Sequence, residues 1–446
     1  MKPSLLLLFL RLFLGDFARG RRGTPRDRRP LVRAVALLLV GGLVSGLPSP
    51  ALAQSRPGQP DGDAPTGMRI RADVVKRGPA LRGAGGSGAN ASLTADGRYV
   101  VSVGADGVYA AKPDSTKPKR LTEHGTWFAP TPDGRFVVVR AGGFTKVSID
   151  GKKTVPLALD EKPGSTAHAV VSNQQLAFVN AAGQVMLVDL NGGKPVMVDL
   201  PTPADKRCHT GAGVPRGFSP DGRWLSVQHG CDEEYLVDPN GGVRKLPFVS
   251  ARFAEGYVIG TPKEQGRMGS SVVVLNPATN ETWTLPDVAY SPFRVVVPRR
   301  LAFLQVVDGT LQLVDLRSKT VTKLEDGSGD VTGFVSTTPD GSTGLYSVHD
   351  EGHCSIRSVE LATGKTRLLA DVEGGQQCFV KPLGNDQAAA YFWRAGPTVA
   401  IAARVHLETG VVEQLGEEIP WIGSLHTAGR TLLISAQIGL LVGTAK

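Results

Sequence analysis

The sequence predicts an all-β protein, a β-propeller of four-stranded blades. Three observations support this: a turn motif recurs along the chain, apolar segments of strand length follow each copy, and helical periodicity is almost absent. The motif is Thr or Ser, then Ala or Pro, then Asp-Gly, and it begins at Thr94, Thr131, Ser219 and Thr338. The glycines of successive copies lie 37, 88 and 119 residues apart, close to one, two and three units of about 40 residues.

Each unit reads as a turn, an apolar strand, a short break, an alternating strand, another turn and a polar outer strand. In the second unit the strands are expected at residues 136–140, 144–149 and 154–157. Weaker copies fill the gaps at 167–200, 252–285 and 294–324. The unit that contains the motif at Thr338 spans 331–369, and it is followed by units at 378–415 and, shorter, at 421–442. This parsing yields nine quasi-repeats. Because nine blades are uncommon, we favour eight within a range of seven to nine.

The chain before the first full unit contains one further strand. Residues 68–81 alternate apolar and charged side chains, as a half-buried strand does. The last repeat lacks an outer strand, which residues 68–81 can supply. Pairing the start of the chain with its end closes a propeller and removes two exposed sheet edges.

Residues 1–53 read as an export signal. An arginine-rich stretch precedes the apolar run 34–46, and Ala51-Leu52-Ala53 has the small residues that signal peptidase accepts. Arg28-Arg29 leaves twin-arginine export open beside the ordinary secretory route. Residues 54–67 are rich in Pro, Gly and polar residues and predict a flexible linker, and residues 68–446 form the propeller. We expect a periplasmic or secreted protein whose mature chain has no integral membrane segment.

The net charge of +9 does not indicate a nucleic-acid partner. Residues 1–53 hold nine of the basic side chains and only two acidic ones, so the rest of the chain has 41 basic and 39 acidic residues. Such a balance gives no bulk attraction for polyanions.

The Pro-Asp-Gly-Arg sequence before a strand resembles the repeat of the TolB-like, WD40-like propellers of bacterial envelope proteins. The resemblance extends over residues 68–442. It implies a propeller of six to eight blades and a role in holding other proteins or cell-wall components. It assigns no catalytic residue.

Four cysteines in an exported chain predict two disulfides. Cys208 and Cys378 lie in loops that enter an inner strand, and Cys231 and Cys354 follow the second strand of their units. Both loop types emerge on one face of a propeller, which favours the pairs Cys208–Cys231 and Cys354–Cys378. A metal site is the alternative, because His209 adjoins Cys208 and several potential ligands precede Cys354.

Polar loop residues on that same face form the candidate binding site. They are His209, His229, Asp232, Glu233, His349, Asp350, Glu351 and His353. The sequence has no Gly-x-Ser-x-Gly elbow and no other catalytic motif, so we expect no catalytic residue, no cofactor and no metal. It favours a non-enzyme that binds a protein or cell-envelope component through one face. The alternative is a propeller-type hydrolase or lyase with a site in the central funnel, where a metal could participate.

Overall fold

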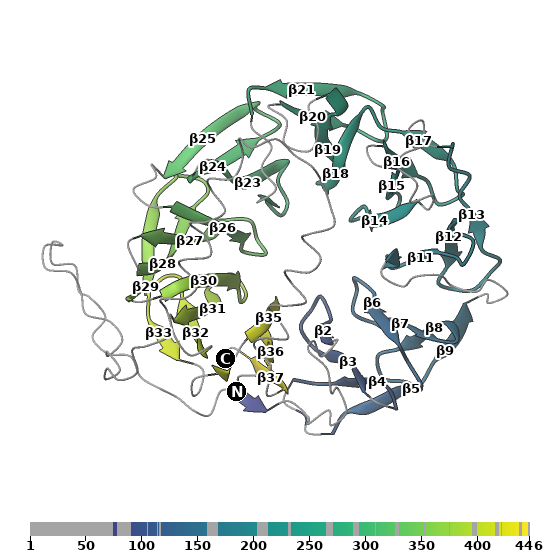
Figure 1. Ribbon diagram of the computed structural model, residues 1–446, viewed down its shortest axis with the longest axis horizontal. Helices are drawn as coiled ribbons and strands as arrows, with labels where there is room; N and C mark the ends of the chain where they lie inside the picture. The colour runs from purple at the N-terminus through teal and green to yellow at the C-terminus, as the bar shows by residue number, and fades with distance from the viewer. Residues whose placement is uncertain are drawn as a thin grey trace, which may run out of the picture. The chain divides into compact units, whose positions relative to one another are not determined.

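The computed structural model describes residues 75–77 and 91–444, apart from 105, 114, 116, 158–167, 203–212, 231–232, 265–270, 289–293, 308, 326–329, 351–352, 374, 395–398, 415–418, 421 and 437–438. The described residues form nine antiparallel sheets, eight with four strands and one with five. Within each sheet, strands that follow one another in the chain are hydrogen-bonded neighbours (Figure 1). We number the sheets in chain order from 1 to 9. The number nine lies within the predicted range and above the favoured value of eight.

The first three sheets are built from short strands. Sheet 1 contains β2 (Ala91–Leu93), β3 (Val100–Gly104), β4 (Gly107–Ala111) and β5 (Lys119–Glu123). Sheet 2 contains β6 (Trp127–Pro130), β7 (Phe136–Ala141), β8 (Gly143–Ser148) and β9 (Thr154–Leu157). Sheet 3 contains β10 (Val170–Val171), β11 (Gln175–Val179), β12 (Val185–Asp189) and β13 (Val196–Met197).

The next three sheets follow the same order. Sheet 4 contains β14 (Val214–Phe218), β15 (Leu225–His229), β16 (Glu233–Val237) and β17 (Val243–Lys245). Sheet 5 contains β18 (Phe248–Ala254), β19 (Tyr257–Pro262), β20 (Ser271–Leu275) and β21 (Thr282–Pro286). Sheet 6 contains β22 (Arg294–Val296), β23 (Ala302–Val307), β24 (Thr310–Asp315) and β25 (Thr320–Glu325).

The last three sheets include the longest strands. Sheet 7 contains β26 (Asp330–Thr337), β27 (Thr343–Asp350), β28 (His353–Glu360) and β29 (Thr366–Glu373). Sheet 8 contains β30 (Gly375–Pro382), β31 (Gln387–Arg394), β32 (Val399–His406), β33 (Val412–Gln414) and the short β34 (Ile419–Pro420), which also pairs with β32. Sheet 9 contains β35 (Ile422–Ala428), β36 (Thr431–Ala436), β37 (Gly439–Thr444) and β1 (Val75–Arg77).

The two ends of the described chain meet in sheet 9. Strand β1 pairs antiparallel with β37, with Val75 opposite Gly443 and Arg77 opposite Leu441. This confirms the predicted pairing of an N-terminal strand with the end of the chain. The remainder of the predicted strand, 68–74 and 78–81, lies outside the described residues.

Apolar side chains bind each sheet to the next. Val101 of sheet 1 packs with Val137 and Val139 of sheet 2, and further mixed clusters join sheets 2 to 7 pair by pair. Leu433 of sheet 9 packs against Leu93 of sheet 1. The valine-rich second and third strands are therefore buried on both faces, and their burial from water is the main stabilising term. No helix in the described part of the chain has the length and hydropathy that crossing a bilayer requires.

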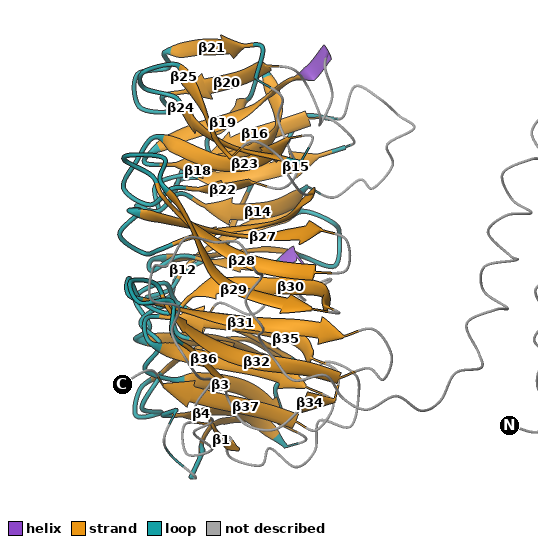
Figure 2. Ribbon diagram, turned by 90° about the vertical axis from the view of Figure 1, so that its left-hand side faces the viewer, coloured by secondary structure: helices purple, strands orange, loops and turns teal. Residues whose placement is uncertain are grey.

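The recurring motif forms the turn between the first and second strands. The Thr94 hydroxyl donates to the Asp96 carboxylate (2.6 Å) and accepts from the Tyr99 amide (3.1 Å), while the Arg98 amide donates to Asp96 (3.0 Å). The copies beginning at Thr131, Ser219 and Thr338 repeat this pattern. Figure 2 shows most of the described loops gathered along one side of the strands. We call this end of the sheets the turn face.

The glycines of three of the four motifs lie directly against the preceding sheet. Gly97 adopts φ = +70° and contacts the Ala428 carbonyl of sheet 9, and Gly134 (φ = +69°) contacts Asp96 of sheet 1. Gly341 of sheet 7 contacts the Pro298 carbonyl of sheet 6 in the same way. A glycine is required here for two reasons, the left-handed backbone and the absence of room for a Cβ.

We predict that Gly97→Ala destabilises the protein far more than Gly142→Ala. Both positions have positive φ (+70° and +84°), so both variants carry a backbone strain of about 1–2 kcal/mol. A Cβ at 97 would overlap the Ala428 carbonyl, whereas nothing lies within 4 Å of a Cβ at 142. Overpacking should add roughly 1–3 kcal/mol to the first variant only. Thermal unfolding of the two variants side by side checks this, and equal losses would refute the glycine contact.

Candidate functional site

The predicted binding residues lie at the end of the sheets opposite the turn face. We call this end the hairpin face, because it carries the β15–β16 and β27–β28 connections. His229 ends β15 and pairs in register with Glu233, the first residue of β16. His349 and Asp350 end β27, and His353 begins β28 opposite Asp350. The two groups belong to sheets 4 and 7, which do not follow one another, so they form two separate clusters. His209, Asp232 and Glu351 lie outside the described residues.

A disulfide joins Cys354 at the start of β28 to Cys378 in β30. Both residues are buried, and their Cα atoms are 6.0 Å apart. The bond therefore ties sheet 7 to sheet 8 at the hairpin face, as the sequence predicted for this pair. Closing a loop of this size stabilises a fold by about 3 kcal/mol in the chain-entropy model. Cys208 and Cys231 lie outside the described residues.

The cluster on sheet 4 is built around a buried carboxylate. Glu233 accepts hydrogen bonds from the Lys245 ammonium (2.6 Å) and the Tyr235 hydroxyl (2.9 Å), and Lys263 of sheet 5 lies 4.0 Å away. Burial opposes ionisation of Glu233, but these hydrogen bonds and the two positive charges hold its pKa below the ordinary value. Burial and Glu233 raise the pKa of Tyr235 to about 12.

His229 completes this cluster. Its ring lies edge-on to Tyr235 with centroids 6.1 Å apart, and its buried Nδ1 has no hydrogen-bond partner among the described residues. Lys245 and Lys263 keep about half of their side-chain surface exposed. The cluster thus presents two ammonium groups to solvent above a buried, ionised carboxylate.

Glu234, next in sequence, has the opposite environment. It faces the other side of the strand, where Ser226 (3.4 Å) and the backbone amides of Ser250 and Ala251 in β18 lie close to its carboxylate. Burial raises the pKa of Glu234, although the charges of Arg216 and Arg252 act in the other direction. Ser250 has φ = +59° within a β-bulge, and this bend turns its amide toward Glu234. Glu234 therefore connects sheets 4 and 5, a role that the sequence did not indicate.

The cluster on sheet 7 is more open. His353 Nδ1 lies 3.8 Å from Asp371 of β29, and both side chains are partly exposed. His349 Nε2 is buried without a hydrogen-bond partner in the described chain. Across the described residues, no three His, Cys, Asp or Glu side chains gather as a metal site would require.

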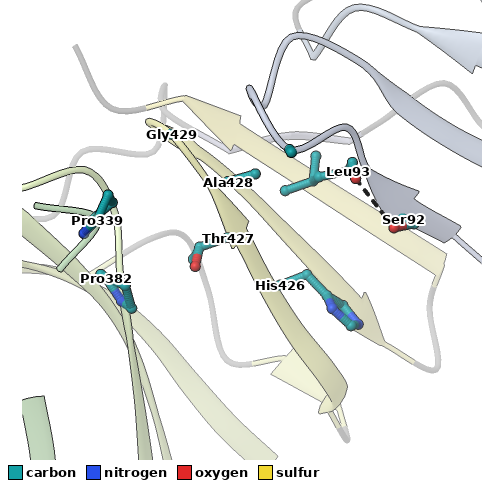
Figure 3. Close-up of a pocket in the computed structure, with 9 residues that line it drawn as sticks. Ser92, Leu93, Pro339, Pro382, His426, Thr427, Ala428 and Gly429 are labelled. Atoms are coloured by element: carbon teal, nitrogen blue, oxygen red, sulfur yellow. Dashed lines mark hydrogen bonds between the residues drawn. The ribbon is translucent and has the colours of Figure 1, made fainter. Parts of the chain in front are cut away.

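A pocket of about 360 Å³ lies at the other end, where sheets 7, 8, 9 and 1 meet. Ser92 and Leu93 come from β2, His426 and Thr427 from β35, and Pro339 and Pro382 from the ends of sheets 7 and 8 (Figure 3). We call it the seam pocket, because sheet 9 contains both ends of the described chain. No pattern in the sequence pointed to it, since its walls come from four different repeats.

Comparison with known proteins yields only distant similarity. The sequence matches no protein-family model and no curated protein. Among solved structures it is similar to the tricorn protease (TM-score 0.38, 12% identity), covering 79% of this chain and 42% of that chain. The chain therefore spans less than half the length of that protein.

Two further solved structures are propeller-like in the same distant way. BamB from Moraxella catarrhalis has a TM-score of 0.38 and 12% identity, over 79% of this chain and 95% of that one. The Dos1 propeller has a TM-score of 0.45 and 11% identity, over 71% and 90%. These values carry no functional argument, and the TolB-like assignment stays a resemblance of the turn motif.

We predict opposite effects for two neighbouring substitutions. The folded pKa of Glu233 is lowered, so its ionisation stabilises the fold above the ordinary value of 4.5, and this stabilisation is lost as pH falls. The folded pKa of Glu234 is raised, so its contribution is present below 4.5 and is lost as pH rises. At pH 7, Glu233→Gln should therefore lose about 1–3 kcal/mol, and Glu234→Gln should match or exceed the parent.

The measurement is the melting temperature of the parent and both variants between pH 2 and pH 8. The difference between Glu234→Gln and the parent should shrink as pH falls toward 4.5, and that of Glu233→Gln should shrink only below 4.5, where Glu233 itself takes up a proton. Two variants that lose the same stability at pH 7 would contradict the assigned environments.

Proposed function

We propose that the mature chain is an exported, closed nine-bladed β-propeller that acts as a non-catalytic scaffold and binds a protein or cell-envelope component through its hairpin face. In this proposal residues 1–53 are an export signal, 54–67 a linker and 68–446 the propeller, located in the periplasm or outside the cell. The nine sheets are the blades, and β1 closes the last one. Contacts between consecutive sheets, including sheet 9 with sheet 1, support the closure.

One observation supports the choice of the hairpin face: its polar clusters lie where cross-links hold neighbouring sheets together. The Cys354–Cys378 bond joins sheets 7 and 8, and the Glu233 cluster joins sheets 4 and 5 through Lys263. Rigid placement lowers the entropic cost of association, because few groups must be ordered on binding. The half-exposed Lys245 and Lys263 give this part of the hairpin face a positive charge, which favours partners with acidic groups.

The second predicted disulfide belongs to this proposal. We expect a proteolytic digest of the unreduced, exported protein to contain a linked peptide pair with Cys208 and Cys231, beside the pair with Cys354 and Cys378. Both pairs should separate after reduction. A digest with Cys208 linked to any other cysteine, or with a free Cys208 thiol, would overturn the Cys208–Cys231 assignment and the cross-link that it adds at the hairpin face.

We predict that the hairpin face, and not the turn face, touches the partner. A photo-crosslinking amino acid at His353 on the hairpin face should yield a discrete adduct in intact cells, and the same amino acid at Arg98 on the turn face should not. Both positions are at least partly exposed, so neither replacement disturbs the core. Adducts at Arg98 alone, or at neither position, would count against the proposed face.

A further inference from the structure

A second polar cluster lies between sheets 4 and 5, on the opposite side of β16 from the Glu233 cluster. Gln228 of β15 pairs in register with Glu234 of β16, and the Ser226 hydroxyl lies 3.4 Å from the Glu234 carboxylate. Leu236, two residues beyond Glu234, belongs to the apolar cluster that joins sheet 4 to sheet 5. Because side chains alternate along a strand, this row of polar groups faces sheet 5.

Irregular first strands place an arginine at each end of the Gln228–Glu234 pair. The register of β14 shifts around Arg216, whose guanidinium donates to the side-chain oxygen of Gln228. In β18 the register shifts just before Arg252, whose guanidinium donates to the Ala251 carbonyl (3.1 Å). The Ala251 amide in turn donates to the Glu234 carboxylate. Such bulges redirect side chains, and Figure 1 shows β14 and β18 on the inner side of their sheets.

The charges of this cluster are unbalanced. Arg216 and Arg252 are both exposed, and each engages one of its five N–H groups in a hydrogen bond within the described chain. Both charges act on Glu234, but a single carboxylate cannot balance two guanidinium groups, and burial raises the pKa of this one. Glu233, on the other side of β16, is engaged by two lysines. The inner edges of sheets 4 and 5 therefore have donors and positive charge available for an anion.

We propose that these inner edges form a phosphate-binding site in which Arg216 and Arg252 hold the anion. A planar guanidinium fork donates two parallel N–H groups to an oxyanion. A phosphate group carries up to two negative charges and presents three or four oxygens, so it matches two forks and two positive charges better than a carboxylate does. Inorganic phosphate and a phosphate monoester share this chemistry. The site is separate from the Glu233 cluster and does not depend on the partner of the proposed function.

The test is calorimetric titration of the purified exported protein with inorganic phosphate and with glycerol 1-phosphate, at constant ionic strength so that screening does not change. Acetate is the control anion. We expect saturable binding of at least one phosphate probe, at least about tenfold tighter than that of acetate. Tighter binding of inorganic phosphate identifies the free anion as the ligand, and tighter binding of glycerol 1-phosphate identifies an esterified phosphate. The absence of saturable phosphate binding, or equally tight binding of acetate, would overturn the proposal.

Matched variants locate the site. Arg216→Gln and Arg252→Gln should each weaken phosphate binding about tenfold, and Arg216→Lys should also weaken it, because an ammonium group keeps the charge but not the fork. Arg223→Gln removes an exposed arginine from the turn face of sheet 4 and should leave binding unchanged. Glu234→Gln should bind phosphate at least as tightly as the parent at pH 7, because it removes a carboxylate that competes for the guanidinium groups. Equal weakening by Arg223→Gln and Arg216→Gln, or a tenfold loss in Glu234→Gln, would each contradict the assigned site.

Discussion

The contact of each Asp-Gly turn with the preceding sheet is the constraint on which the rest of the structure depends. Gly97, Gly134 and Gly341 each place a bare Cα against the previous turn or strand end, and the Asp and Thr side chains satisfy the amides that such a tight turn exposes. Contacts also run forward, because Asn173 accepts from the Asp133 amide and Asn385 from the Asp340 amide. These contacts join sheets 9, 1, 2 and 3 to one another and, separately, sheets 6, 7 and 8, so displacing one of these sheets at the turn face would disturb its neighbours.

This constraint makes the packing of the turn face differ from that of the hairpin face. The turn face is packed by short, glycine-dependent turns that leave little freedom for other side chains. Among the described residues, the hairpin face shows other cross-links in place of such turn contacts. Sheets 7 and 8 have first, second and third strands of eight residues each and carry the Cys354–Cys378 bond at that end. Sheets 4 and 5 are joined by Glu234 and by the Glu233–Lys263 pair.

The sequence predicted the fold wherever a local signal existed. The motif located four turns, the alternation near residue 75 located the strand that pairs with β37, and loop position located the Cys354–Cys378 pair. The parsing found nine units, and the preference for eight came only from the rarity of nine-bladed propellers. Several turns between first and second strands lack the motif: Ser172 caps its own turn, and Glu255 (φ = +48°) and Arg299 (φ = +58°) reach left-handed backbone without Asp-Gly. The environments of Glu233 and Glu234 depend on residues of the next sheet, such as Lys263 and Ser250. Contacts at that separation leave no pattern in a single sequence.

Sheet 9 joins the two ends of the described chain. Sheet 9 has its fourth strand from the N-terminal side of the chain, and β1 contributes only three paired residues. Without β1 the edge of β37 would be open to pairing with another chain.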